Sequence, residues 1–449
     1  MSAADSPSSA RFEQTRERIL DGAARLFNQR GIKAGTLAEV ATSVGLATNS
    51  LTYYYRRKED LVAACLLRSI SVVSAVVDAA STEPDLASRV RGFITRFVAL
   101  MADIAAGRQP ELIFFSDMRA LPQPQAGPVF EAYTQLFRSV RGLLRPAQAQ
   151  AERSAAQRRA HNAQAHLLLS LAIWSRAWLG RYEPEDQARA GQWLADVLLH
   201  GLAAPGQRWP VQNGLANAPT AAASGEAETQ ADITELTRAA YLRTATRLVN
   251  EQGLGGASVA RIAAQLDLTK GSFYHHHSTK EALILACFER SFELIRQCQR
   301  RAAAAPGNGW ERLLQATLPL ARLQLSDQGP LLRATAWSAL PAALRWGQFS
   351  IMNRLGERFG AFIVEGMVDG SLRLLDPGVA AQQINGMING LAELEHWVPG
   401  VDSTNVVELY AKPLMIGMLQ AQTCTAVHSP RLSSVAGQHR SAGADRAHI

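Results

Sequence analysis

The sequence predicts an all-α protein made of two similar halves, and three observations support this prediction. Residues 15–70 recur at residues 237–292 with a constant offset of 222 and no gap, and 19 of the 56 paired positions are identical. Apolar residues recur at the 3.6-residue spacing of amphipathic helices, and no segment shows the clear alternation of a strand. A repeat of this length indicates two copies of a domain, because solenoid units have roughly 20–50 residues.

The repeated unit begins with three predicted helices. They span residues 16–30, 36–44 and 47–54 in the first copy, and residues 236–252, 258–265 and 269–276 in the second. Thr36 and Glu39 have the spacing of a capping box, in which each side chain satisfies a free amide at the start of a helix. Gly31 and Gly45 end the helices before them. Two short helices joined by a tight turn, behind a longer helix, form a helix-turn-helix.

The second copy resembles the TetR family of bacterial repressors. The resemblance is carried by residues 258–283, SVARIAAQLDLTKGSFYHHHSTKEAL, in which His277 replaces the usual final aromatic residue. The first copy departs further, because residues 48–55 lack the Lys-Gly pair and have Thr52 where a tyrosine is common. The two copies cover about a quarter of the chain. The resemblance implies that each half has a helix-turn-helix DNA-binding domain followed by a helical regulatory domain.

Helical patterns continue beyond each copy of the repeat, and Gly and Pro residues separate them. In the first half they cover residues 58–80, 86–106, 110–119, 128–144, 153–180 and 184–203. In the second half they cover residues 281–304, 309–325, 329–343, 347–366, 377–397 and 404–422. Residues 204–232 contain Pro, Gly and small residues with few large apolar side chains, which indicates a linker.

These segments divide the chain into seven parts. We expect a disordered tail at 1–10, a first helix-turn-helix domain at 11–57, a first regulatory domain at 58–203, the linker at 204–232, a second helix-turn-helix domain at 233–279, a second regulatory domain at 280–422 and a disordered tail at 423–449.

Charge and cysteine content narrow the class of protein. The net charge is +7, with ten Lys/Arg against six Asp/Glu in residues 11–70 and seven against five in residues 233–292. This modest basic excess suits contact with phosphates on limited faces. Four cysteines without a Cys-x-x-Cys cluster predict neither a disulfide framework nor a zinc site. No signal peptide, uncharged apolar 18-residue run, metal site or cofactor is indicated, so a cytoplasmic location is expected.

The residues expected to contact DNA lie on the helix-turn-helix units and at the start of the next helix. An α-helix fits the major groove, and small or polar side chains allow close approach. In the first copy these residues are Thr36, Thr48, Asn49, Ser50, Thr52, Tyr53 and Lys58. In the second copy they are Ser258, Thr269, Lys270, Gly271, Ser272, Tyr274, His275 and Lys280.

Asn49 suits pairing with adenine, and Lys270 suits guanine or a phosphate. Lys58 and Lys280 would clamp a phosphate, as the equivalent lysine does in family members; solvated surface charges are the alternative. Tyr55 takes the position of the family's buried aromatic residue, so packing is expected there. His275, His276 and His277 cannot converge on one metal ion, because consecutive helical residues point about 100° apart.

In family members a cavity among the middle helices accepts a small molecule, whose binding changes the spacing of the reading heads. An apolar or amphipathic effector is therefore one hypothesis here, and ordinary helical core is the alternative for each candidate residue. The candidates are Phe115, Met118, Trp174, Trp178, Trp337, Trp346, Met352 and Phe359.

The family pairs protomers through the last two helices of each regulatory domain, which form a four-helix bundle. Matching apolar stripes occur in both halves, at Leu169, Ile173, Val197 and Leu198 and at Ile384, Met387, Ile388 and Leu391. A linker of about 29 residues spans roughly 30 Å as a flexible coil, close to the 34–36 Å between half-sites. We therefore expect the halves to pair within one chain and to read an asymmetric operator. A homodimer with four reading heads is the alternative.

The predicted function is a sequence-specific transcriptional regulator, a ligand-responsive repressor with two non-identical heads that bind double-stranded operator DNA. An architectural or protein-binding helical scaffold without a specific operator is the alternative. An enzyme is not indicated, because no Ser/His/Asp or paired-carboxylate constellation stands out.

Overall fold

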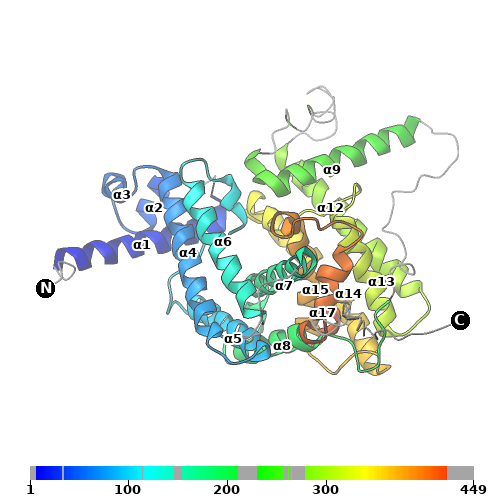
Figure 1. Ribbon diagram of the computed structural model, residues 1–449. Coiled ribbons are helices and arrows are strands. Elements are labelled where there is room, and N and C mark those ends of the chain that lie inside the picture. Colours follow the sequence, from blue (N-terminus) through cyan, green and yellow to red (C-terminus); the bar gives the residue numbers. More distant parts are fainter. Residues whose placement is uncertain are drawn as a thin grey trace, which may run out of the picture.

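The computed structural model describes residues 7–32, 35–113, 115–145, 154–210, 230–256, 261, 264 and 279–421. Figure 1 shows two helical halves that meet along α7 and α15. No strand occurs within the described ranges, where an isolated antiparallel bridge joins Ala203 and Leu372. The predicted all-α fold is confirmed.

The first half contains the following elements. They are α1 (Pro7–Arg30), α2 (Leu37–Ser43), α3 (Thr48–Tyr54), α4 (Lys58–Ser81), α5 (Leu86–Ala105), the 3₁₀ helix η1 (Phe115–Ala120), α6 (Ala126–Leu143), α7 (Ala155–Trp174), the 3₁₀ turns η2 (Ser175–Ala177) and η3 (Leu179–Arg181), and α8 (Gln187–His200). Helix α1 begins inside the segment expected to be a disordered tail.

The second half repeats this plan in its described part. Its elements are α9 (Gln230–Gly256), α12 (Lys280–Ala304), α13 (Gly309–Gln324), η5 (Ala334–Ala339), α14 (Ala342–Val368), α15 (Pro377–Gly390), η6 (Leu391–Glu393), α16 (Leu394–Trp397), the π-helix η7 (Val407–Ala411) and α17 (Lys412–Ile416). Residues 418–421 add one helical turn.

Helix α4 is long and apolar enough, by composition alone, to span a membrane. Its residues Leu61, Leu66, Val73 and Val77 are buried, and the helix packs against α1, α5 and α6. Part of the apolar surface of this helix is therefore buried in the protein core.

Two segments expected to be helices are largely extended. Residues 110–113 precede the short helix η1, and residues 329–333 precede η5, where helices over 110–119 and 329–343 were expected. Side chains distant in sequence accept hydrogen bonds from backbone amides here, such as Ser69 from Ile113 and Ser291 from Leu332, and these amides are not available to a helix. We call residues 110–113 the first anchoring loop and residues 329–333 the second anchoring loop.

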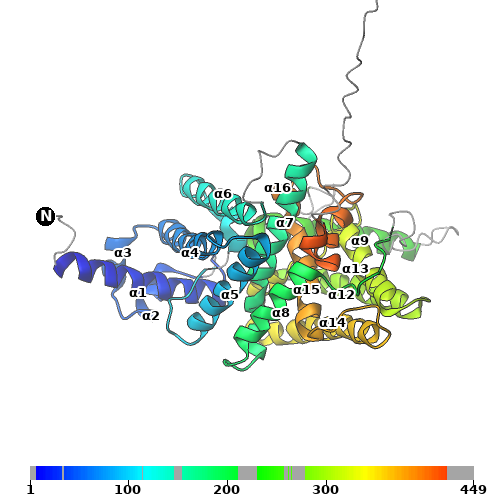
Figure 2. The same ribbon diagram turned by 60° about the horizontal axis from the view of Figure 1, so that its bottom comes forward.

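The two halves share one apolar core. Helices α7 and α8 pack against α15, and α8 also contacts α17, so buried residues of both halves form a continuous cluster. Figure 2 shows α7, α8 and α15 at the centre, with α1 on one side and α9 and α13 on the other. A smaller core around Leu242, Ile284 and Phe288 lies where α9 meets α12.

The backbones of the two halves touch where α8 and α17 end. Gly201 has φ 73° and Gly417 has φ 89°, and a Cβ added to Gly201 would clash with the Gly417 amide nitrogen. The amide of Leu202 donates to the carbonyl of Met415 at 2.8 Å. Glycine is needed at both positions, because the two backbone segments approach closely and each glycine has a positive φ, which side chains disfavour.

The first residues of the expected linker are fixed on the second half. The amide of Ala204 donates to the Ser371 carbonyl at 3.1 Å, and Trp209 Nε1 donates to Glu408 Oε1 at 2.6 Å. Helix α9 begins at Gln230, so residues 211–229, which lie outside the described residues, connect the halves.

Replacing Gly201 by alanine tests the backbone contact between the halves. Gly201→Ala is expected to lower the free energy of unfolding by about 1–3 kcal/mol more than Gly107→Ala, because the added methyl group meets backbone atoms. Gly107 is the matched control, since it has φ 72° but no atom within 4 Å of an added Cβ. Urea unfolding followed by circular dichroism measures both losses. Equal losses would show that the left-handed conformation alone, and not the contact, requires glycine.

Candidate nucleic-acid interface

The first helix-turn-helix is held by local caps and by α1. Thr36 Oγ1 accepts from the Glu39 amide at 3.2 Å, and the Thr36 amide donates to Glu39 Oε2 at 3.0 Å, which completes the capping box of α2. Gly45, with φ 70°, makes the turn into α3. Arg18 Nη2 donates to the Val44 carbonyl at 2.8 Å and so ties this turn to α1.

Helix α3 presents a polar face to solvent. Leu51 is completely buried and anchors the helix, whereas Thr48, Asn49 and Ser50 are exposed and Tyr53 is 77% exposed. Thr52 is half-buried, and its hydroxyl donates to the Asn49 carbonyl at 2.9 Å. Thr36, at the start of α2, is also exposed. The surface that these residues form is small and polar enough for close approach to base edges.

Aromatic packing fixes α3 against α1. The rings of Phe12 and Tyr54 stack with centroids 4.7 Å apart, and Phe12 meets Tyr53 edge-on at 6.3 Å. Tyr55 is buried, and its hydroxyl accepts from Arg16 Nε at 3.3 Å. Burial raises the pKa of Tyr55, an effect that the bond from Arg16 opposes. Phe12 was missed in the sequence because it precedes the repeated segment.

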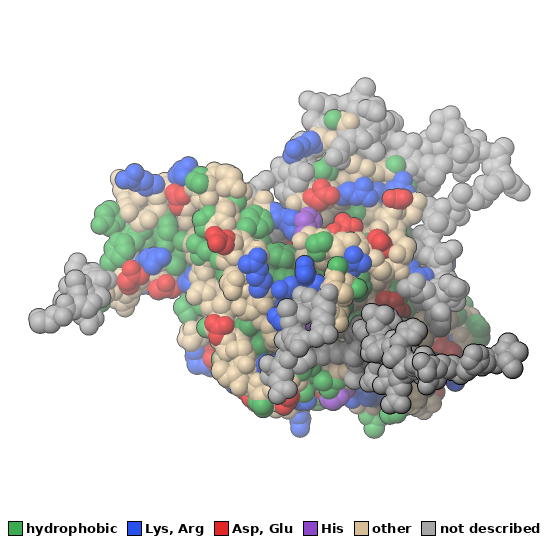
Figure 3. Space-filling model, in the orientation of Figure 1, with side chains coloured by type: hydrophobic (Ala, Val, Ile, Leu, Met, Phe, Trp, Pro, Cys, Tyr) green, Lys and Arg blue, Asp and Glu red, His purple; other side chains and the backbone are tan. Residues whose placement is uncertain are grey.

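A basic edge adjoins α3. Arg56 and Arg57 are exposed, and Lys58, which is half-buried, is the first residue of α4. Figure 3 shows basic side chains beside α2 and α3 and again in the central region between the halves. The two arginines were not singled out from sequence, although they form an Arg-Arg-Lys run with Lys58.

In the second copy the structure describes only part of the expected DNA contact. Ser258, Thr269, Lys270, Gly271, Ser272, Tyr274 and His275 lie outside the described residues. Lys280 is exposed and is the first residue of α12, as Lys58 is of α4. Thr279 caps this helix by accepting from the Ala282 amide at 3.1 Å.

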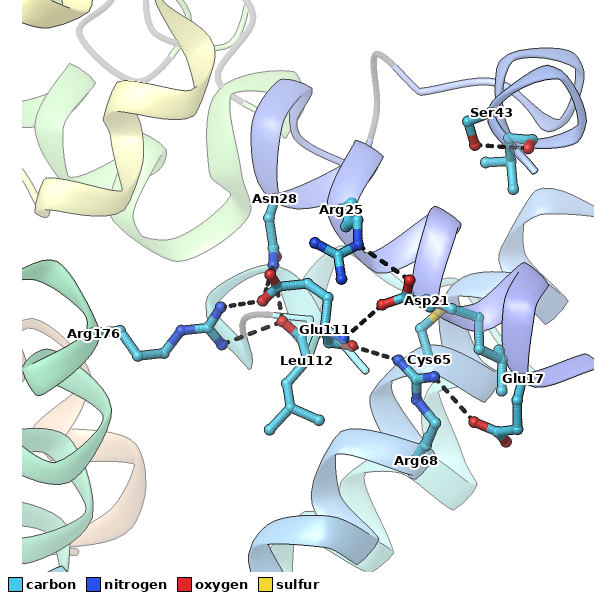
Figure 4. Close-up of polar contacts among 12 residues, drawn as sticks. Glu17, Asp21, Arg25, Asn28, Ser43, Cys65, Arg68, Glu111, Leu112 and Arg176 are labelled. Atoms are coloured by element: carbon cyan, nitrogen blue, oxygen red, sulfur yellow. Dashed lines mark hydrogen bonds and ion pairs between the residues drawn. The ribbon is translucent and has the colours of Figure 1, made fainter. Parts of the chain in front are cut away.

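The first anchoring loop is bonded to α1 and α4, the helices on either side of the helix-turn-helix (Figure 4). Asn28 of α1 donates to the Leu112 carbonyl at 2.8 Å, and Ser69 of α4 accepts from the Ile113 amide at 3.0 Å. Arg68 of α4 donates to the Glu111 carbonyl. This loop therefore bonds to both helices that flank the helix-turn-helix.

The same contacts recur in the second half. Asn250 of α9 donates to the Leu331 carbonyl at 2.8 Å, Ser291 accepts from the Leu332 amide at 2.9 Å, and Arg290 donates to the Pro330 carbonyl at 2.9 Å. Burial lowers the pKa of Arg290 to about 10. The sequence contained an indication of these contacts, because the Asn, Arg and Ser residues that make them are identical between the two copies.

A cavity of about 410 Å³ lies between the halves. Of the residues expected to line a cavity, Phe115, Met118, Trp174 and Trp337 do so. Trp178 and Phe359 are buried in the core, Met352 packs against it, and Trp346 is 76% exposed. None of these four residues lines the cavity: three pack in the protein interior, and Trp346 lies on the surface.

Polar residues that the sequence did not reveal also line the cavity. They are Asn28, His166, Ser170, Arg176, Thr335, Arg333, Arg345, Asn389 and Glu393. Arg176 forms an ion pair with Glu111 at 2.6 Å, and Arg333 pairs with Glu393. His166 contacts the Tyr410 hydroxyl through Nδ1 at 3.1 Å, and burial lowers the pKa of His166 to about 3. This histidine is therefore neutral near pH 7.

A profile of the bacterial regulatory proteins of the tetR family matches residues 19–65 and 242–287, once in each copy of the repeat. Both helix-turn-helix segments of the chain thus match this family. The HTH-type transcriptional regulator AcrR of Shigella flexneri is 37% identical over 49 residues, which are 11% of this chain and 23% of that protein. The chain thus spans about a quarter of the length of this curated relative.

Two solved structures align with part of the chain. PfmR from Thermus thermophilus is 17% identical, with 40% of this chain and 94% of that chain covered and a TM-score of 0.32. AibR in complex with isovaleryl coenzyme A and operator DNA is 22% identical, with 40% and 97% covered and a TM-score of 0.33.

The residues expected at the contact between the two halves are mostly buried. Leu169, Val197, Leu198, Ile384, Met387, Ile388 and Leu391 belong to the core that both halves share. Ile173 is half-buried and lines the cavity. Polar contacts accompany them, such as Arg159 Nε to the Pro399 carbonyl at 3.1 Å and Asn162 Nδ2 to the Trp397 carbonyl at 3.1 Å.

The buried His166 predicts a pH-dependent stability. Unfolded chains bind this proton near pH 6.5 and the folded protein only near pH 3, so the unfolded state binds more protons in between. Stability is therefore lost as pH falls below 6.5, by at most about 1.4 kcal/mol per pH unit from this group. His166→Gln is expected to flatten the dependence of unfolding free energy on pH between 6.5 and 4.5.

The control is His200→Gln, because the His200 side chain is 45% exposed. Urea titrations at several pH values measure the unfolding free energy of both variants and of the unmodified protein. If His166→Gln kept the full slope, other groups would be responsible for the acid sensitivity.

Proposed function

We propose that this protein is a sequence-specific, ligand-responsive transcriptional repressor that acts in the cytoplasm. The observation that carries the proposal is the polar, exposed face of α3, fixed on α1 beside the basic edge at residues 56–58. In such a domain a helix enters the major groove, and neighbouring cations and helix N-termini hold phosphates. Thr48, Asn49, Ser50 and Tyr53 are the proposed reading residues of the first head.

We propose further that the two halves act as an intramolecular pseudo-dimer. The continuous core between α7, α8, α15 and α17 supports this assignment, because the surfaces that would pair two protomers are covered within one chain. The reading helices differ in sequence, with Thr48-Asn49-Ser50 in the first copy and Lys270-Gly271-Ser272 in the second. The expected operator is therefore asymmetric, with two different half-sites.

The phosphate contacts predict a defined change in salt dependence. Lys58→Ala and Lys280→Ala should each weaken binding across DNA sequences and reduce the slope of log affinity against log salt by about one unit. Arg301→Ala is the control, because Arg301 is exposed near the far end of α12, roughly 30 Å along the helix from Lys280. Fluorescence anisotropy at several salt concentrations measures the slopes. Unchanged slopes in both lysine variants would place these side chains in solvent.

The oligomeric state and the operator can be tested together. Light scattering at nanomolar to micromolar concentration is expected to give 48.6 kDa, the mass of one chain. Selection of bound DNA from a random pool is expected to yield two unequal half-sites. Twice this mass together with palindromic sites would support the homodimer, and binding without any preferred sequence would support the architectural scaffold.

A further inference from the structure

Neighbouring residues at the end of α1 bond to different halves of the protein. The side chain of Asn28 donates to the Leu112 carbonyl of the first anchoring loop at 2.8 Å. The carbonyl of Gln29, the next residue, accepts from Arg345 Nη1 of α14 in the second half at 2.6 Å. Helix α1 packs against the helix-turn-helix of the first head, so this head is attached to both halves.

Arg345 is held in place for this contact. Its Nε donates to the Leu340 carbonyl at 2.7 Å, which orients the half-buried guanidinium group toward Gln29. Gln29 lies in the last turn of α1, where backbone carbonyls have no acceptor role within the helix itself. A cation at a helix C-terminus also interacts favourably with the helix dipole. Arg345 therefore caps α1 from the opposite half.

The equivalent position in the second copy also meets an arginine of the opposite half. Asn250 of α9 bonds to the second anchoring loop, and Glu251, the next residue, corresponds to Gln29 in the repeat. Burial lowers the pKa of Arg119 in η1, whereas Tyr133 and Glu251 act to raise it. Arg119 of the first half is therefore close enough to α9 to be attracted by the Glu251 carboxylate.

The helices are packed in the same crossed manner. Helix α1 contacts η5 of the second half, and α9 contacts η1 of the first half. Each half thus contributes a 3₁₀ helix to the support of the other half's head. Tilting one head relative to the other would break contacts between the halves, so the heads are expected to keep one relative position.

We propose that Arg345 and Arg119 are positioning residues that fix the two heads in one relative orientation, so that the protein binds its two half-sites at a single spacing only. Arg345 acts on the first head through a backbone carbonyl, and Arg119 acts on the second head through the charge of Glu251. The spacing requirement rests on the proposed function, whereas the contacts that position the heads do not.

Operators with altered spacing test the proposal on the full-length protein. Inserting two base pairs between the selected half-sites moves them about 7 Å further apart and rotates one by roughly 70° around the duplex. The unmodified protein is expected to lose at least about tenfold in affinity, because fixed heads cannot engage both half-sites of the lengthened operator. An undiminished affinity for this operator would overturn the proposal.

Replacing Arg345 separates positioning from general damage. Arg345→Ala should reduce the loss on lengthening to less than about threefold, while its affinity for DNA with either half-site alone stays unchanged. Arg354→Ala is the matched control, because Arg354 is exposed on the same helix and bonds to Ser350 of that helix at 3.1 Å. Gln29→Ala is a second control, because the bond from Arg345 uses the backbone carbonyl. A full loss in Arg345→Ala, or a reduced loss in either control, would contradict the assignment.

Replacing Glu251 tests the corresponding contact of the second head. Glu251→Gln removes the attraction to Arg119, so the loss on lengthening should fall by at least about twofold. Glu289→Gln is the control, because it removes one exposed carboxylate from α12 and changes the net charge equally. The same loss in both variants would exclude the role of Arg119.

A measurement without DNA distinguishes this inference from the proposed function. Spin labels are placed at exposed positions, by Ala38→Cys in α2 and Ala361→Cys in α14, in a chain that carries Cys424→Ser. The described native cysteines are buried. Pulsed electron resonance is expected to give a narrow distribution of distances between the labels, which broadens with Arg345→Ala and not with Arg354→Ala.

The two kinds of measurement fail independently. If DNA selection yields no operator while the distance distributions differ as expected, the proposed function fails and the positioning role stands. If an operator is found but the distributions of the two arginine variants are equal, the positioning role fails and the proposed function stands.

Discussion

The apolar contact between α7, α8, α15 and α17 is the constraint on which the rest of the structure depends. It merges most of both halves into one core and brings the glycine backbones at 201 and 417 together. Two of these helices, α7 and α15, also line the cavity between the halves. Because both partners lie on one chain, their association is intramolecular, and the effective concentration of one half near the other is high. The halves can therefore pair without contacts as extensive as those of a separate dimer.

Much of the fold followed from local patterns in the sequence. The capping box at Thr36, the glycine turns at 31 and 45 and the apolar stripe of α4 depend on residues close together in the chain, so their structure was predictable. The anchoring loops were not predictable in this way. Their amides are bonded by Ser69, Asn250 and Ser291, which are remote in sequence, and helical propensity does not reveal such partners.

In the candidate sites, too, the features that depend on nearby residues were predictable and those that depend on remote residues were not. The exposure of Thr48 to Ser50 and the burial of Leu51 follow from helix periodicity, although their contact with DNA remains a prediction. Trp174 and Trp178 have similar sequence surroundings, yet only Trp174 lines the cavity, because the chain turns through η2 between them. The ion pairs of Arg176 and Arg333 were not foreseen, since each depends on how a loop is placed against a distant helix.

The two halves are joined by one polypeptide, whose residues 204–210 are bonded to the second half. This connection matters most in a cell that contains few copies of the protein. A separate dimer dissociates as its concentration falls, so the fraction with two heads depends on copy number. A covalently joined pair does not dissociate on dilution. In the proposed pseudo-dimer, each newly made molecule therefore carries both heads, and mutations in one head leave the preferred half-site of the other unchanged. Under this proposal, fusion frees the two copies to evolve different preferences.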